Sequence, residues 1–302
     1  MPAVSIIIPT FNRADTIEAS IRSVLQQTFQ DFELIVVDDA STDDTVATVS
    51  AIEDHRLTLV RAAANGGGAR ARNLGLQRAT APLVAFQDSD DFWLPDKLAS
   101  QVRKVTEAGP GCVGTFCSFI YLTGTRAALL PAVAQIPAED VPRTLFRRNL
   151  ISTQTLLARR EDLDAIGGFD PEMPRFQDWE LCIRLAQRGT ILHDPAAGVV
   201  VRAMPNSIST RYEAGIEARR RIIDLCRRLD APVAAQAAQR FDLGARLLAA
   251  GQMQEAAACF REARRLGGGV KSLAGLALSR LPGGFVKSAA GTVLARRDGV
   301  LR

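Results

Sequence analysis

Residues 4–10 read VSIIIPT, and this stretch decides the fold. Apolar and β-branched side chains run almost without interruption from Val4 to Ile8, and the run stops at Pro9. Such a run is typical of a strand that is buried on both faces of a parallel sheet. Both faces of that sheet need covering helices, so the sequence that follows should alternate between helices and strands.

The chain keeps this alternation as far as residue 86. Short apolar runs typical of strands recur at residues 33–37 (ELIVV), 57–60 (LTLV) and 83–86 (LVAF). Helices are expected between them, at residues 14–27, from 41–44 to about 53, and at 69–79. The order predicts an α/β fold of the Rossmann-like kind, in which a mostly parallel sheet carries helices on both faces.

The pattern is less regular after residue 95. Strands are expected at residues 112–122, 156–158 and 199–201, a proline-punctuated loop at 131–142 and a helix at 177–188. From Tyr212 onward the sequence is typical of helices. We therefore divide the chain into an N-terminal α/β domain, residues 1–210, and a helical C-terminal region, residues 211–302.

The helical region contains one recognisable unit, at about residues 241–265. Its small and apolar residues match the spacing of a single tetratricopeptide-like hairpin: Leu243, Gly244, Leu247, Gly251, Ala256, Phe260 and Ala263. Solenoids of this kind need about three or more repeats for stability. A single unit favours a hairpin that packs on the main domain over an array that binds peptides.

The bulk composition is that of a globular protein. Of 302 residues, 47% are hydrophobic and 23% are charged. No apolar run reaches the roughly 18 residues that a membrane span needs, and the N-terminus does not resemble a signal peptide. Five scattered cysteines without a CxxC pair favour reduced thiols and a cytoplasmic location.

Charge is distributed unevenly along the chain. Residues 211–302 hold 17 Lys and Arg against 8 Asp and Glu, a net charge of +9, whereas residues 1–210 carry a net charge of −5. The tail is interpreted either as an ordinary solvated helical surface or as a surface attracted to an anionic membrane at its cytoplasmic face. No feature indicates binding to nucleic acid.

Three polar clusters follow predicted strands. They are residues 9–13 (PTFNR), Asp38-Asp39, and residues 88–90 (DSD). Ligands of parallel α/β sheets bind beyond the carboxyl ends of the strands. The three clusters should therefore meet at one edge of the sheet, and this convergence predicts a ligand site.

The carboxylates in AFQDSDDFW, residues 85–93, suggest a divalent cation. Closely spaced Asp side chains suit a hard ion such as Mg²⁺ or Mn²⁺, which usually also binds substrate phosphates. Only two histidines are present, His55 and His193, and neither has a metal-ligand neighbour at a useful spacing, which argues against zinc. The simpler interpretation is an acidic turn in which Asp91 caps the next helix.

Two further stretches carry possible chemistry. Residues 65–73 (NGGGARARN) place glycines at the start of a helix, where anions are attracted, or form a plain flexible turn. Asp178 opens the helix of residues 177–188 and is either a simple first-turn carboxylate or a general base.

Taken together, these stretches resemble the inverting glycosyltransferases of family 2, which have the GT-A fold. The resemblance covers about residues 1–210 and rests on six stretches in the family's order: SIIIPTFNR, ELIVVDDASTDDT, NGGGARARN, AFQDSDDFWLPDKL, GGFD and QDWELCIRL. It implies transfer of a hexosyl or N-acetylhexosaminyl group from a nucleotide-diphosphate sugar, with UDP favoured. The acceptor implied is a hydroxyl of a glycan or of a lipid-linked intermediate of polysaccharide biosynthesis.

The resemblance also assigns residues to roles. It implies a Mn²⁺ or Mg²⁺ ion held by Asp90 and Asp88, with Asp178 as the catalytic base. Nucleotide-sugar contacts are implied for Pro9, Thr10, Asn12, Arg13, Asp39, Gly67, Arg72, Asp88 and Ser89. Acceptor contacts are implied for Gly168, Phe169, Asp170 and Trp179.

Two positions depart from the family's pattern. Gln177 stands where many members have Glu before the base, and Met204 stands where members often have a His that joins the metal site. A thioether is a poor ligand for a hard ion. A non-catalytic nucleotide-sugar-binding module is therefore kept as an alternative. Phosphoryl transfer through an Asp nucleophile fits less well because Phe92 replaces the Thr or Val of that pattern, and a receiver domain fits less well again.

Overall fold

A computed structural model describes residues 1–202 and 212–279. The segment that contains Met204 and the predicted domain boundary at residue 210 lie outside these ranges. The chain divides into two compact units. The first consists of Met1–Pro142, Asn149–Glu172 and Gln177–Pro205, and the second of Arg143–Arg148, Met173–Phe176 and Asn206–Arg302.

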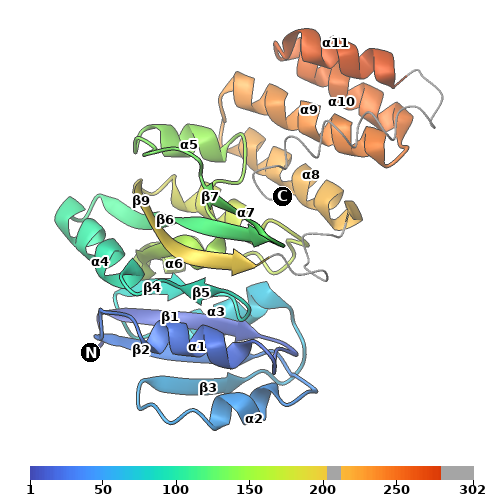
Figure 1. Cartoon of the computed structure of the whole chain (residues 1–302). Helices are drawn as coiled ribbons and strands as arrows, with labels where there is room; N and C mark the ends of the chain where they lie inside the picture. The colour runs from blue at the N-terminus through green and yellow to red at the C-terminus, as the bar shows by residue number, and fades with distance from the viewer. Residues whose placement is uncertain (203–211, 280–302) are drawn as a thin grey trace. The chain divides into compact units, whose positions relative to one another are not determined.

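The first unit is built on one sheet of nine strands, in the order β3-β2-β1-β4-β8-β6-β9-β5 with β7 paired to β6 (Figure 1). Its strands are β1 (Val4–Thr10), β2 (Phe32–Asp38), β3 (Leu57–Arg61), β4 (Leu83–Phe86), β5 (Phe92–Trp93), β6 (Cys112–Thr123), β7 (Arg126–Leu130), β8 (Leu156–Arg159) and β9 (Thr190–Arg202). Strands β3, β2, β1 and β4 are parallel, as the sequence predicts. Beyond β4 the sheet is mixed, because β8 is antiparallel to both of its neighbours.

Helices of the first unit follow its strands. They are α1 (Ile17–Leu25), α2 (Thr45–Ser50), α3 (Gly68–Arg78), α4 (Lys97–Ala108), α6 (Arg160–Ala165) and α7 (Gln177–Leu185), with a 3-10 turn, η1, at Thr153–Thr155. A further short helix, α5 (Asp140–Leu145), begins in the first unit, where the sequence predicts the end of a loop, and ends in the second unit.

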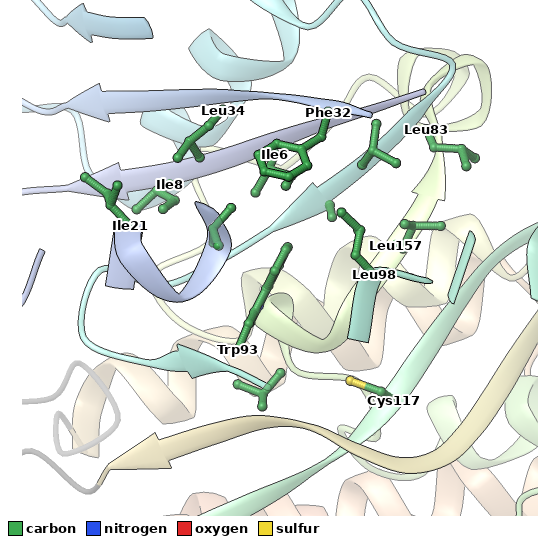
Figure 2. Close-up of a cluster of buried hydrophobic side chains, with 14 of the residues drawn as sticks. Ile6, Ile8, Ile21, Phe32, Leu34, Leu83, Trp93, Leu98, Cys117 and Leu157 are labelled. Atoms are coloured by element: carbon green, nitrogen blue, oxygen red, sulfur yellow. The ribbon is translucent and has the colours of Figure 1, made fainter. Parts of the chain in front are cut away.

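Strand β1 explains how the sheet is covered. Ile6 and Ile8 point into a buried cluster with Ile21 of α1 and Leu34 of β2 (Figure 2). Ile7 points to the other face, where a Cβ on Gly75 of α3 would lie only 2.5 Å from its Cγ2. Alternate side chains of a strand face opposite sides of a sheet, so β1 is buried by α1 on one face and by α3 on the other.

Strand β9 is much longer than the predicted strand at residues 199–201. Its first part is not evident in the sequence because polar residues and Pro195 interrupt the apolar pattern. In the register, Cys117 pairs with Asp194 and Ser118 with Ala197, so Pro195 and Ala196 form a bulge. A bulge is where a sheet tolerates proline, since no ladder hydrogen bond is lost there. The end of β9 also pairs with β5, a two-residue strand that the sequence does not predict.

Residues 212–279 of the second unit are mainly helical. They contain α8 (Tyr212–Arg228), α9 (Val233–Ala249), α10 (Met253–Arg265) and α11 (Gly269–Leu278). Helices α9 and α10 form a hairpin that includes the predicted range 241–265, and Gly251 adopts a left-handed φ of +82° at its turn. Phe260 of α10 packs closely against Gly244 of α9 and Gly275 of α11, so a third helix joins the hairpin.

Candidate active site

The carboxyl ends of β1, β2 and β4 meet at one edge of the sheet. Thr10 pairs with Asp38, and Ile7 of β1 pairs with Phe86, the last residue of β4. The polar residues that follow these strands therefore lie near one another, as the sequence analysis expects. Two of the separate clusters are linked directly, since Arg13 Nε lies 3.8 Å from Asp90 Oδ2.

Asp39 organises the glycine-rich loop. Its Oδ1 accepts a hydrogen bond from the Gly66 amide at 2.8 Å, and its Oδ2 accepts one from the Gly67 amide at 2.7 Å. Asn65 donates to the Asp39 carbonyl at 3.1 Å. Gly67 has φ +84°, which favours glycine. The buried Asp39 carboxylate thus fixes the loop from which α3 begins.

Arg72 joins the glycine-rich helix to the acidic segment. Its Nη2 donates to Asp88 Oδ1 at 2.6 Å, and its Nη1 donates to Gln177 Oε1 at 3.4 Å. The Arg72 side chain is 12% exposed and that of Asp88 29%. Arg72 therefore links three segments that are distant in sequence, and the ion pair of Arg72 with Asp88 remains partly accessible to solvent.

Asp90 is the less neutralised of the two partly exposed acidic residues. Burial raises its pKa, and the nearby Asp88 carboxylate raises it further. Its side chain is 24% exposed, and the Arg13 guanidinium is too distant for a hydrogen bond. Two adjacent carboxylates with incomplete charge compensation suit a hard divalent cation.

Asp91 has a different role from its two neighbours. It is buried, its Oδ2 accepts a hydrogen bond from Gln154 Nε2 at 2.9 Å, and its carbonyl accepts one from Gln87 at 2.8 Å. Burial and the charges of Asp88 and Asp90 raise its pKa well above the ordinary value. Helix α4 begins only after Asp96, so the interpretation of Asp91 as a helix cap is wrong and Asp91 belongs to a buried polar network.

Asp178 lies in the first turn of α7. Its Oδ2 accepts a hydrogen bond from Asn149 Nδ2 at 3.1 Å, and its Oδ1 accepts one from the Trp179 amide at 2.8 Å. Burial raises the pKa of Asp178, although both hydrogen bonds and the charge of Arg72 act in the opposite direction. A carboxylate with a raised pKa is, in its ionised form, a stronger proton acceptor than an ordinary one.

Asn149 is a site residue that the sequence analysis missed. Besides donating to Asp178, it has a buried Oδ1 without a hydrogen-bond partner among the described residues. No motif surrounds it in the sequence, where it follows Arg147 and Arg148. Only its place in the fold reveals it, because 29 residues separate it from Asp178 along the chain.

The residues expected near an acceptor have mixed exposure. Gly168 (φ +66°) and Phe169 are held by Asn73 of α3, whose amide donates to the Phe169 carbonyl at 2.8 Å and accepts from the Phe169 amide at 2.9 Å. The Phe169 ring is buried edge-on against Phe86. Trp179 is also buried, while the Asp170 carboxylate accepts a hydrogen bond from the Glu172 amide.

The remaining predicted donor contacts lie at the end of β1 or in the segments that follow β1 and β4. Pro9 and Thr10 are buried, and the Thr10 hydroxyl is without a hydrogen-bond partner among the described residues. Exposed Asn12 adopts φ +51°, and its Oδ1 accepts a hydrogen bond from the Thr42 amide. Ser89 is buried between the two carboxylates of the DSD stretch. These residues line the same edge of the sheet as Asp39 and Asp88.

A metal ion at this edge would need ligands from outside the protein. In residues 1–202 and 212–279, no three His, Cys, Asp or Glu side chains are grouped as a metal-binding set. Asp88 and Asp90 provide carboxylate oxygens of the right chemistry, and Mg²⁺ or Mn²⁺ commonly completes its shell with phosphate oxygens and water. The residues present therefore fit such an ion when a diphosphate is bound with it.

Comparison with known sequences identifies relatives. The model of the family described as "Glycosyl transferase family 2" matches residues 5–165. TuaG of Bacillus subtilis, whose name assigns it to teichuronic acid biosynthesis, is 42% identical over 193 residues, which are 62% of this chain and 73% of TuaG. The Escherichia coli enzyme WfaP, named a UDP-Glc:alpha-D-GlcNAc-diphosphoundecaprenol beta-1,3-glucosyltransferase, is 42% identical over 103 residues, or 34% of this chain. The match spans 41% of WfaP, less than two thirds of its length.

Solved structures share the fold. Staphylococcus aureus TarS in complex with UDP-GlcNAc has a TM-score of 0.69 at 19% identity, covering 92% of this chain and 90% of that one. A Pyrobaculum calidifontis mannosyltransferase in complex with GDP-Man and Mn²⁺ has a TM-score of 0.65 at 21% identity, covering 99% and 87%. The fold of this chain is therefore the GT-A fold, with a helical region after it.

Proposed function

Because the chain belongs to glycosyl transferase family 2, we propose that it transfers a sugar from a nucleotide-diphosphate donor to a hydroxyl group, with inversion at the anomeric carbon. The observation that carries the proposal is the meeting of Arg72, Asp88 and Gln177 at 2.6 and 3.4 Å, next to Asp178 in the chain. Separate elements thus bring charged groups for the donor and a proton acceptor to one site.

The donor is proposed to be a UDP-sugar carrying a hexose or an N-acetylhexosamine. The names of WfaP and of the TarS complex contain UDP-linked sugars. Pro9, Thr10, Asp39 and Gly67 would surround the nucleotide, since Pro9 and Thr10 end β1 and Asp39 and Gly67 follow β2 and β3 at the carboxyl edge. Ionised Asp only accepts hydrogen bonds, so Asp39 suits the imide N–H of uracil. Arg13 and Arg72 supply positive charge for the diphosphate.

A divalent cation belongs to this proposal. Asp90 would hold Mn²⁺ or Mg²⁺, and Asp88 would share it or contact the ribose and sugar. When bound, the ion offsets the negative charge that develops on the departing diphosphate. The protein's residues would then orient the sugar so that its anomeric carbon faces α7. The pairing of Arg72 with Asp88 would be kept in this arrangement.

Asp178 is proposed as the general base. Its carboxylate takes the proton of the acceptor hydroxyl while the hydroxyl oxygen bonds to the anomeric carbon. The bond from that carbon to the diphosphate oxygen breaks in the same displacement, and the electron pair leaves with the nucleoside diphosphate. Asn149 and the Trp179 amide hold the carboxylate in place through the rearrangement. The acceptor would lie near Gly168 and Asp170, as a glycan or a lipid-linked saccharide.

Assays with a panel of nucleotide-sugars test this function. The protein is incubated with each radiolabelled donor, Mn²⁺ and short polyprenyl-diphosphate saccharides, and the anomeric configuration of any product is determined by NMR. We expect transfer from one UDP-sugar with inversion. Tight donor binding without transfer or hydrolysis would favour the alternative, a non-catalytic nucleotide-sugar-binding module.

Contact with an anionic membrane is proposed for the helical region. On α11, Val270 is 80% exposed and Leu273 is 42% exposed, and both point away from the buried Ser272 and Gly275. The exposed cations Arg264, Arg265 and Lys271 lie nearby in the chain. Apolar side chains flanked by cations are typical of helices that lie on a membrane surface. No helix of the described residues is long and apolar enough to cross a bilayer.

A further inference from the structure

Asp178, the proposed base, and its hydrogen-bond partner Asn149 each come, along the chain, shortly after a segment that belongs to the helical unit. Asn149 follows Arg143–Arg148, and Gln177 and Asp178 follow Met173–Phe176. Both segments pack within the second unit, whereas Asn149 and Asp178 belong to the first. Asn149 is therefore the first residue after one of these segments, and Asp178 is the second residue after the other.

The first segment is anchored by a buried glutamine of α9. Gln239 Nε2 donates a hydrogen bond to the Phe146 carbonyl at 2.8 Å, and Gln239 is completely buried. The thiol of Cys226 in α8 lies 3.9 Å from the same carbonyl. A buried backbone carbonyl that loses its donor is costly, so Gln239 fixes the position of Phe146, three residues before Asn149.

The second segment is anchored through its own Phe176, because arginine guanidinium groups lie against the ring. The Phe176 ring lies 5.6 Å from the guanidinium carbon of Arg219 in α8 and 4.6 Å from that of Arg175. Phe176 also has φ +61°, a left-handed conformation that is rare for an aromatic residue and persists only where the surroundings hold it. This conformation sets the direction in which the chain enters α7 and Asp178.

One buried contact links the two anchors. Arg219 Nη1 donates to Gln239 Oε1 at 2.7 Å, and Arg219 lies 3.8 Å from Asp242 of α9. The Arg219 side chain is almost completely buried. Gln239 thus holds one segment directly, and through Arg219 it is coupled to the other.

We infer that Gln239 and Arg219 are positioning residues for the proposed base, acting through Phe146 and Phe176 to hold Asn149 against Asp178. The inference rests on the proposed role of Asp178 and extends it to the helical region. In that role the helical unit contributes to the proposed catalysis. Misplacing a reacting group by about 1 Å can cost as much as 100-fold in rate.

The test compares variants of the full-length protein. Gln239→Met keeps the volume and removes both hydrogen bonds, and Arg219→Lys is a milder second variant that keeps the charge. Phe260→Leu is the matched control, because it loosens the packing of α9, α10 and α11 without touching either segment. For each we measure kcat, donor KM, UDP affinity by calorimetry, and amide hydrogen exchange in residues 149–151 and 177–181.

We expect Gln239→Met to lower kcat by about tenfold or more, with donor KM and UDP affinity within about twofold, and to raise exchange in both ranges. Arg219→Lys should do the same to a smaller extent, and Phe260→Leu should do neither. An equal fall in kcat for Phe260→Leu, or unchanged kcat and exchange in both anchor variants, would overturn the inference.

Hydrogen exchange separates this inference from the proposed function. If Asp178→Asn transfers sugar as fast as the wild type, the base assignment fails. In that case faster exchange in residues 149–151 and 177–181 of Gln239→Met would still support the positioning of Asn149 and Asp178, and unchanged exchange would contradict it.

Discussion

At the scale of single residues, the site depends on how each carboxylate is compensated. Asp39 is satisfied by two backbone amides, Asp88 by Arg72, and Asp91 by a buried glutamine. Asp90 has the weakest compensation, because the guanidinium paired with it lies 3.8 Å away. The four residues share a chemical type, yet their partners assign them to different tasks.

The weak compensation of Asp90 leads to a prediction about metal dependence. UDP should bind more tightly with Mn²⁺ than without it, because the ion would bridge the diphosphate and Asp90. In Asp90→Ala this dependence should disappear. Calorimetric titration of both proteins with and without Mn²⁺ measures it, with Asp96→Ala as a surface control. Equal UDP affinity of the wild type in the two conditions would remove the metal from the proposal.

Asp178 leads to a prediction about pH. A base works in its ionised form, so transfer should increase as pH rises through the raised pKa of Asp178. Burial is the main cause that raises that pKa, Asn149 and Arg72 lower it, and Asp88 raises it slightly. Gln177→Glu would add a negative charge beside Asp178 and raise the pKa further. The acidic limb of the kcat profile should then lie at higher pH in Gln177→Glu than in wild type. A limb that is unchanged or shifted to lower pH would contradict this prediction.

The positions of the residues that lie in recognisable motifs could be predicted from the sequence, for a physical reason. Parallel strands bring their carboxyl ends together, so the order of strands along the chain is enough to place Asp39, Asp88 and Asp90 at one edge. Asn73 and Asn149 could not be predicted, because their function lies in long-range hydrogen bonds to Phe169 and Asp178. The difference between Asp90 and Asp91 also needed the fold, since the depth of burial and the hydrogen bond from Gln154 to Asp91 separate two adjacent carboxylates.

At the scale of elements, α3 carries Arg72, which is proposed to face the donor, and is held tightly against the sheet. A Cβ on Gly75 would lie 2.5 Å from Ile7 Cγ2, a distance at which atoms must move. The N-terminal end of the same helix presents Gly68 and Arg72. The packing of one glycine therefore determines where the Arg72 guanidinium lies relative to Asp88.

Gly75→Ala should destabilise the protein by about 1–3 kcal/mol, the usual cost of overpacking a core. It should also weaken UDP binding, because α3 would shift away from β1 and take Arg72 with it. Denaturant unfolding and calorimetry measure the two effects. Gly111→Ala is the matched control, since nothing lies within 4 Å of its added Cβ. Equal stabilities of the two variants would show that α3 is not held as described.

Prediction of the elements was good where apolar periodicity was uninterrupted and poor elsewhere. Strands β1 to β4 and helices α3 and α7 agree with the sequence to within a few residues. Most of strand β9 was missed because Pro195, which lies in a bulge, interrupts the apolar pattern. Strand β5 was missed because two residues are too few to show an alternating pattern. Helix α11 extends the predicted hairpin, and its glycine contact with Phe260 follows only from the packing of distant residues.

At the scale of the whole molecule, the excess positive charge of the C-terminal region leads to a prediction about membranes. The protein should sediment with vesicles that contain anionic phospholipid at low salt, and less so at moderate salt, because screening weakens the attraction. Val270→Ser and Leu273→Ser together should weaken this binding, whereas Val233→Ser, a change at an exposed valine of α9, should not. Equal binding to neutral and anionic vesicles would indicate an ordinary solvated surface.

The division into two units also links the helical region to the proposed catalysis. Two short segments of the chain leave the sheet-containing unit, pack within the helical unit, and return at Asn149 and Gln177. Sequence reasoning treats residues 211–302 as an addition to an otherwise complete domain. The contacts of Gln239 and Arg219 show instead that helices α8 and α9 hold chain segments that lead into the site.

The central claim is that Asp178 is the base of a sugar transfer, and Asp178→Asn tests it most directly. The amide keeps the size of the side chain and removes the proton acceptor, and in the proposal the donor is held elsewhere, by Asp39, Arg72 and the cation. General-base catalysis typically contributes about 10²–10⁴-fold. We predict that the kcat of Asp178→Asn falls by that order while UDP affinity stays within about twofold. Transfer at nearly the wild-type rate would contradict the claim.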